Sequence, residues 1–97
     1  MMTPLTLTPG RRPDGTALLT AVGEIDMSNT DALAAALDET PGPLVLDLTG
    51  IDYLDSAGLS VIFPHAERIE IIATALLQPV LTISGLADLT TIHRMEL

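Results

Sequence analysis

Alternating hydrophobic and polar positions predict two strands near the start of the chain. Leucine alternates with threonine over residues 4–8, which is the period of a half-exposed strand. Residues 9–15 are rich in turn-forming types and end in Asp-Gly, a pair that favours a hairpin. Residues 16–22 then form the return strand, closed by Gly23. The chain is therefore expected to open with an antiparallel pair of strands.

A helix is predicted to follow this pair. Residues 28–31, Ser-Asn-Thr-Asp, match the capping box that satisfies free amides at a helix start. Leu33, Ala36 and Leu37 then share one helical face. Two acidic residues after them oppose the helix dipole, and Pro-Gly-Pro at residues 41–43 ends the element.

Two further strands are predicted by apolar composition. Residues 44–48 are almost wholly apolar and bounded by breakers, which is typical of a parallel strand covered on both faces. A turn region is expected over residues 49–54. Residues 69–73 are rich in isoleucine, a β-branched type that favours a fourth strand.

A second helix is expected to begin at Ser56 and to end near Arg68. Four apolar residues follow the i, i+3, i+4, i+7 spacing of an amphipathic helix: Leu59, Ile62, Phe63 and Ala66. Pro64 should kink or shorten this helix, because proline removes one backbone hydrogen bond. Later, Pro79 suits a first helical turn, and Ser-Gly at residues 84–85 breaks that element. Residues 87–97 are expected to form a last short helix and a frayed edge strand.

This order of elements predicts an α/β fold in one domain, residues 1–97. Strands alternating with helices imply crossover connections and a mostly parallel sheet of four to five strands, with an antiparallel strand at one edge. Functional sites in such sheets collect where strands end and helices begin. Two of these junctions are rich in small polar residues, 23–29 and 47–58. They should lie side by side if their strands are neighbours.

Composition narrows the function classes. The formal net charge is −9, from thirteen acidic residues and four arginines, so the surface repels nucleic acid and anionic lipid. This acidity either keeps the protein soluble or suits a partner with a basic contact surface. The chain has no cysteine, secretory signal pattern or apolar run long enough to span a membrane. A cytoplasmic protein without direct membrane insertion is therefore expected.

The clearest candidate for chemistry is Asp55-Ser56-Ala57-Gly58-Leu59, at a helix start after a buried strand. Unpaired amides and the positive end of the helix dipole make such a place suitable for a side-chain cap or for a phosphate group. Two interpretations follow. Asp55 or Ser56 caps the helix and Gly58 permits close packing, or Ser56 is a functional hydroxyl.

Three segments in this order resemble the STAS domain, a family named after sulfate transporters and anti-sigma factor antagonists. They are Gly-Glu-Ile-Asp at residues 23–26, the apolar strand 44–48, and Asp-Ser-Ala-Gly-Leu at residues 55–59. The resemblance covers residues from about 17 to 63. It implies a mixed sheet with helices mainly on one face, which agrees with the element order above.

The resemblance also implies a function. In similar bacterial members, an anti-sigma factor with serine kinase activity phosphorylates the serine that corresponds to Ser56, and phosphorylation ends the binding of that partner. Asp26 and Asp55 would flank the phosphoacceptor, and Ser28 would lie on the same rim. Three residues of the helix start, Ala57, Gly58 and Leu59, would contribute to the partner surface. The alternative is a STAS subunit of a transporter-associated or stress-sensing assembly that needs no phosphorylation.

Enzymatic and cofactor functions are disfavoured by the residues present. A serine hydrolase needs a nearby histidine, yet His65 lies roughly 13 Å along the same helix from Ser56 and His93 lies in the tail. Acidic residues at 47, 52 and 55 match no calcium loop, and the chain has no lysine for a phosphate-binding loop. We expect neither catalysis nor a bound metal or cofactor. Self-association is left open by the sequence.

Overall fold

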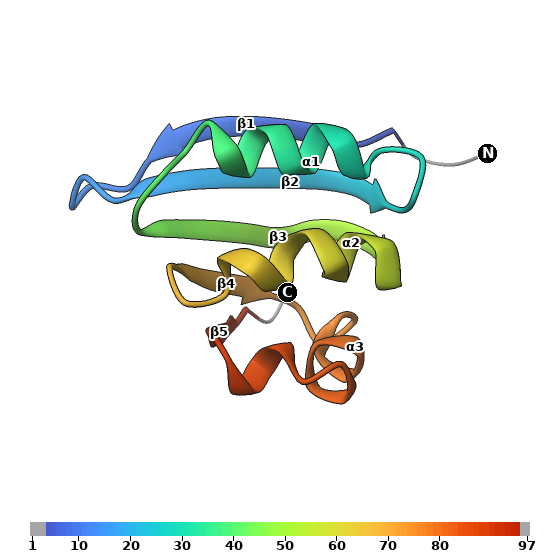
Figure 1. Cartoon of the computed structure of the whole chain (residues 1–97). Helices are drawn as coiled ribbons and strands as arrows, with labels where there is room; N and C mark the ends of the chain where they lie inside the picture. Colours follow the sequence, from blue (N-terminus) through green and yellow to red (C-terminus); the bar gives the residue numbers. More distant parts are fainter. Residues whose placement is uncertain (1–3, 96–97) are drawn as a thin grey trace.

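The computed structural model describes residues 4–95 and contains one sheet of five strands. The strands lie in the sheet in chain order: β1 (Thr6–Arg11), β2 (Ala17–Ile25), β3 (Leu44–Leu54), β4 (Ile69–Ala73) and β5 (Thr91–Arg94). β1 pairs with β2 in the antiparallel sense, and the other three pairs are parallel (Figure 1). The predicted α/β fold with an antiparallel edge strand is thereby confirmed.

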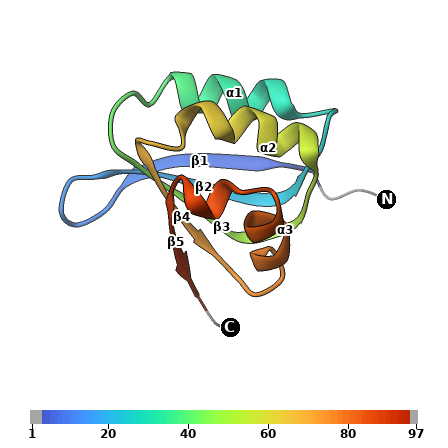
Figure 2. The same ribbon diagram turned by 60° about the horizontal axis from the view of Figure 1, so that its bottom comes forward.

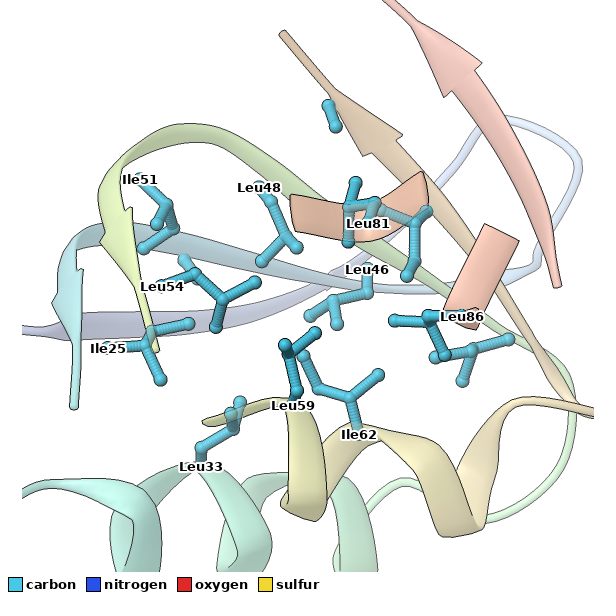
Figure 3. Packing of buried hydrophobic residues seen from close by; sticks show 14 of the residues in the cluster. Ile25, Leu33, Leu46, Leu48, Ile51, Leu54, Leu59, Ile62, Leu81 and Leu86 are labelled. Carbon is cyan, nitrogen blue, oxygen red and sulfur yellow. The ribbon is translucent and has the colours of Figure 1, made fainter. Parts of the chain in front are cut away.

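Helices α1 (Thr30–Asp38) and α2 (Ser56–Ile62) lie next to each other over one face of this sheet (Figure 2). The short helix α3 (Gln78–Ile83) adds Leu81 to the same core near β4. Leucine and isoleucine side chains from the sheet and the helices meet between the layers (Figure 3). Because the burial of apolar side chains is the main force favouring the folded state, this single interior holds the helix starts against the strand ends.

The opening hairpin is longer than the sequence indicates. β1 continues to Arg11, so Pro9 belongs to the strand rather than to the connector. A proline is tolerated there because β1 is an edge strand, where one side of the backbone needs no partner. β2 likewise runs past Gly23 to Ile25. Gly23 has a φ of +115°, and a Cβ there would stand 2.2 Å from the carbonyl oxygen of Pro4, so the position requires glycine.

The predicted turn at residues 49–54 is wrong, because β3 continues through it to Leu54. The register moves from Thr20↔Asp47 to Val22↔Gly50, and again from Gly23↔Ile51 to Glu24↔Tyr53. At each step β3 contains one residue more than β2, which is the arrangement of a β-bulge. Turn-forming residue types therefore occur here inside a bulged strand. The second bulge leaves two consecutive side chains, Asp52 and Tyr53, exposed.

The predicted capping box at residues 28–31 is also wrong. α1 begins at Thr30, and its N-cap residue, Asn29, makes no side-chain cap hydrogen bond. The Asn29 side chain instead donates to the Glu24 carbonyl oxygen at 2.8 Å and accepts from the Asp26 amide at 3.1 Å. Ser28 is engaged with Asp26 in the same turn. These polar side chains close the loop after β2, so they are not available to cap the helix.

Pro64 shortens the second helix, as its chemistry predicts. α2 ends at Ile62, and Pro64 lies in a 3-10 turn (Phe63–His65) before the chain reaches Arg68. The Arg68 guanidinium then donates to backbone oxygens at the end of α1 and beyond it: Leu37 (2.8 Å), Thr40 (2.6 Å) and Gly42 (2.8 Å). Arg68 therefore ties the segment after α2 to the far end of α1.

The last part of the described chain differs from the predicted helix. Pro79 does occupy the first turn of α3, and Gly85, with a φ of +87°, follows its end. Only the 3-10 turn Leu86–Asp88 follows, before β5 adds to the sheet in parallel. The edge strand expected here is confirmed. In the described part of this segment, the only helical structure is that 3-10 turn. Residues 96–97 of that prediction lie outside the described residues, as do residues 1–3 of the predicted domain.

Candidate functional site

Ser56 is the first residue of α2, and its side chain is exposed. Asp55 is the N-cap, and its Oδ1 accepts a hydrogen bond of 3.0 Å from the amide of Gly58. Within residues 4–95 the Ser56 hydroxyl takes part in no hydrogen bond, whereas the Ser56 carbonyl accepts one from Ser60. Of the two candidates for the cap, the structure therefore selects Asp55, and the Ser56 hydroxyl is left facing solvent.

The two polar junctions lie side by side, as predicted from neighbouring strands. The Asp55 amide donates to the Ile25 carbonyl oxygen at 3.2 Å, which joins the start of α2 to the end of β2. Gly58 and Leu59 are buried against this junction, and Ala57 is half-buried. Among the predicted partner-binding residues, Gly58 and Leu59 therefore contribute to packing beneath the surface, while Ala57 is partly accessible.

Asp26 lies at the end of β2 and is only 7% exposed. Its Oδ1 accepts hydrogen bonds from the Ser28 amide at 2.8 Å and from the Ser28 hydroxyl at 2.5 Å. Its Oδ2 is buried and has no hydrogen-bond partner among the described residues. A buried carboxylate oxygen without a donor lowers the stability of the fold. Ser28, the other predicted rim residue, is exposed.

Sequence reasoning missed two residues of this site, Met27 and Tyr53. The side chain of Met27 is 79% exposed and that of Tyr53 is 49% exposed. Both line a shallow depression of about 530 Å³ whose other lining residues are Glu24, Asp26, Ser28 and Asp55. An available signal was that Tyr53 is one of only two aromatic residues and lies between two acidic residues, Asp52 and Asp55. We call this hollow the acidic depression.

The ion pairs of the described residues lie outside the acidic depression. Ion pairs in the described part of the chain join Arg12 to Glu70 (4.0 Å), His93 to Glu70 (3.6 Å) and His65 to Asp38 (3.9 Å). A larger hollow of about 670 Å³ lies at the opposite end of the sheet and includes the first of these pairs. Since its Arg12 is already paired there, this hollow offers less unbalanced charge than the acidic depression.

The structure also bears on catalysis and metal binding. His65 is hydrogen-bonded to Arg68 and lies beyond the end of α2, and His93 lies on β5, so neither is placed as the base of a Ser56 triad. Over residues 4–95, no three His, Cys, Asp or Glu side chains are grouped closely enough to hold a metal ion. No helix in this range has the length and apolar character needed to cross a membrane.

A parallel sheet with an antiparallel edge, helices on one face, and a serine exposed at the start of the second helix define a STAS-type domain. The family model described as "Mlab, STAS domain" matches residues 10–91. The chain belongs to the STAS domain family.

Relatives with curated names support this family assignment. Over 60 residues the chain is 37% identical to the anti-sigma-F factor antagonist RsfB of Mycobacterium tuberculosis, in both of two strains. The match covers 58% of this chain and 49% of RsfB, so it spans about half the length of that relative.

Solved structures share the fold at low identity. A crystal structure of an anti-sigma factor antagonist from Mycobacterium paratuberculosis superposes with a TM-score of 0.81 at 24% identity, over 93% of this chain and 86% of that one. An antisigma-factor antagonist STAS domain from Rhodobacter sphaeroides gives 0.53 at 17% identity, over 71% and 84%. A protein with a SpoIIAA-like fold from Shewanella loihica gives 0.61 at 14% identity, over 98% and 88%.

Proposed function

We propose that this protein is an anti-sigma factor antagonist that binds a kinase-type anti-sigma factor and is released from it when Ser56 is phosphorylated. The observation that carries the proposal is that two adjacent residues at the start of α2 differ in role: one caps the helix and the other does not. Asp55 caps the helix, so the Ser56 hydroxyl is exposed and free to accept a phosphoryl group. RsfB is named an anti-sigma-F factor antagonist and the M. paratuberculosis protein an anti-sigma factor antagonist, which supports the same class of partner for this chain.

Electrostatics explains how the modification would act. A phosphoserine adds about −1.5 to −2 charges at neutral pH. The helix N-terminus tolerates this charge, so the fold persists, but Asp55 stands next to it and the acidic depression lies beside that cap. A docked partner would have to desolvate this concentrated negative charge. A change of about 3 kcal/mol is sufficient to weaken binding more than a hundredfold.

A phosphorylation assay tests the proposal. The protein is incubated with candidate anti-sigma kinases and labelled ATP, together with the variants Ser56→Ala and Ser60→Ala. Ser60 is a matched control, because it is an exposed serine on the same helix. Label on the wild type and on Ser60→Ala, but not on Ser56→Ala, is the expected result. Equal label on all three proteins would contradict the assignment of Ser56.

A STAS subunit of a transporter-associated or stress-sensing assembly is the alternative function. The match of the STAS family model to residues 10–91 is compatible with this alternative, which needs the same fold but no phosphorylation of Ser56. Stable co-purification with membrane transporter subunits, and no label on Ser56, would support this alternative. Both functions make the protein a non-enzymatic binding module, and the proposal places it in the cytoplasm with a protein rather than nucleic acid as its partner.

A further inference from the structure

We infer that Asn29 is a positioning residue for partner recognition: its side chain fixes the loop between β2 and α1, residues 26–29, in the shape that the anti-sigma factor binds. The inference rests on the proposed function, because it concerns how that partner is recognised. The sequence pattern placed Asn29 only inside a capping box. Its role here is different, since it acts through the shape of the loop.

The Asn29 side chain ties this loop to the end of β2. Its Nδ2 donates to the Glu24 carbonyl oxygen at 2.8 Å, and its Oδ1 accepts from the Asp26 amide at 3.1 Å. The Asn29 amide also donates to the Asp26 carbonyl oxygen at 3.1 Å. In the described chain β1 pairs with β2 only as far as Val22, so the end of β2 has a neighbouring strand on one side alone. Asn29 adds hydrogen bonds at a strand end that has lost its second neighbour.

Burial does not hold the middle of this loop. The side chain of Met27 is 79% exposed, and Ser28 is exposed as well. Both line the acidic depression beside the residue that caps α2. The positions of these two side chains relative to the start of α2 therefore depend on the hydrogen bonds that close the loop, and those of Asn29 join it to the strand.

The choice of asparagine fits this role better than the role of a cap. Serine, threonine, aspartate and asparagine all cap helices by accepting a hydrogen bond from a backbone amide. Closing this loop requires a donor and an acceptor on two separate atoms of one short side chain, and aspartate, which has the same shape as asparagine, has no donor when ionised. At Asn29 the side chain holds the loop and makes no cap hydrogen bond to α1. This use of a cap position to fix a loop is the observation that carries the inference.

The first test needs no partner and uses Asn29→Asp, which replaces one NH2 group by oxygen. The carboxylate cannot donate to the Glu24 carbonyl, and the positive end of the α1 dipole favours its turning to cap that helix. Hydrogen exchange followed by NMR should show the Asp26 amide exchanging about tenfold faster, because its acceptor has moved away. The urea midpoint of unfolding should be unchanged or higher. An Asp26 amide that exchanges within twofold of the wild type, or a lowered midpoint, would overturn the inference.

The second test uses the anti-sigma factor that labels Ser56. Asn29→Asp and Asn29→Ala should each raise the KM for phosphorylation about tenfold and leave kcat within threefold, because docking depends on the loop whereas the Ser56 hydroxyl is unchanged. Asp14→Asn is the matched control, since it exchanges the same two groups in the exposed hairpin between β1 and β2. That hairpin lies at the other end of β2 (Figure 1), so the KM of this variant should stay within twofold of the wild type.

The outcomes separate the two proposals. If the wild type is labelled but both Asn29 variants keep a KM within twofold of it, the positioning role is wrong and the proposed function stands. A raised KM in Asn29→Asp alone would assign the effect to the added charge, and a lower kcat at unchanged KM would assign it to the chemical step; each overturns the inference. If no anti-sigma factor binds or labels the wild type, the proposed function fails. The exchange measurement then decides by itself whether Asn29 fixes the loop.

Discussion

Gly58 of α2 lies so close to Ile25 of β2 that a Cβ atom on Gly58 would stand 2.5 Å from Ile25 Cγ2. The same atom would stand 2.7 Å from Leu54 Cδ1. Ile25 and Leu54 are both buried, so neither side chain has free space to move into. This contact brings the start of α2 against the ends of β2 and β3, the strand ends on which the candidate site is built.

Gly58→Ala should therefore lower the free energy of unfolding by about 1–3 kcal/mol, the usual cost of overfilling a packed core. Gly58→Val should cost more and should also weaken partner binding. Urea unfolding measures the effect, and Gly10→Ala is the control, because a Cβ at Gly10 meets nothing within 4 Å. Unchanged stability in Gly58→Ala would mean that Ile25 and Leu54 can shift at little cost.

Substitutions of the cap residue, Asp55, and of the proposed phosphoacceptor, Ser56, should change the free energy of unfolding by different amounts. Asp55→Ala removes the side chain that accepts from the Gly58 amide and should cost about 1 kcal/mol. Ser56→Ala should stay within about 0.5 kcal/mol of the wild type, because it alters an exposed side chain that makes no cap. Ser56→Asp should unfold nearly as the wild type does but lose partner binding. If Ser56→Asp unfolds the domain instead, the serine is structural and the proposed switch fails.

Arg68 should be the most important arginine for stability. Its guanidinium donates to backbone oxygens of Leu37, Thr40 and Gly42, two of them at or just after the end of α1. Arg68→Ala should lower the free energy of unfolding by about 2–3 kcal/mol, since hydrogen bonds from a charged donor are stronger than neutral ones. Arg68→Lys should restore only part of this, because an ammonium lacks the planar fork.

Arg12→Ala provides the contrast in the same unfolding experiment. Arg12 forms an exposed pair with Glu70 at 4.0 Å, and such surface pairs contribute about 0–1 kcal/mol. Equal losses in the Arg12 and Arg68 variants would show that the backbone contacts of Arg68 add nothing beyond its charge.

The hydrogen bond between Asp14 and Thr16 in the hairpin turn should depend on pH. The Thr16 amide donates to Asp14 Oδ1 at 2.9 Å, and this hydrogen bond lowers the pKa of Asp14 below its ordinary value of 3.8. Because the bond favours the charged carboxylate, its contribution is present above the unfolded pKa and is lost as the pH falls through the lower folded pKa. NMR titration should give an Asp14 midpoint below 3.8, with the Thr16 amide shifting at the same pH. A midpoint at or above 3.8 would show that the turn does not hold this bond.

Local chemistry in the sequence was sufficient to determine most of the framework. The apolar run at residues 44–48, the Asp-Gly turn of the hairpin, the helix-breaking Pro64 and the Asp-Ser start of α2 each act through near neighbours in the chain. Periodicity and turn preference are properties of short segments, so these features could be predicted without coordinates. The order of such segments also predicted the mostly parallel sheet and the adjacency of its two polar junctions.

Only the tertiary structure decided how far β3 extends, what Asn29 binds and which residues line the candidate site. The Thr49–Leu54 segment remains a strand because β2 pairs with it across two bulges, and Asn29 closes a loop instead of capping α1 because Glu24 and Asp26 are within its reach. Tyr53, in β3, and Met27, two residues after the end of β2, line one depression because these two strands end side by side. The strand pairing and the shared depression depend on partners far along the chain. The Asn29 contacts span only three and five residues, but they form because the loop after β2 takes its particular shape in the fold.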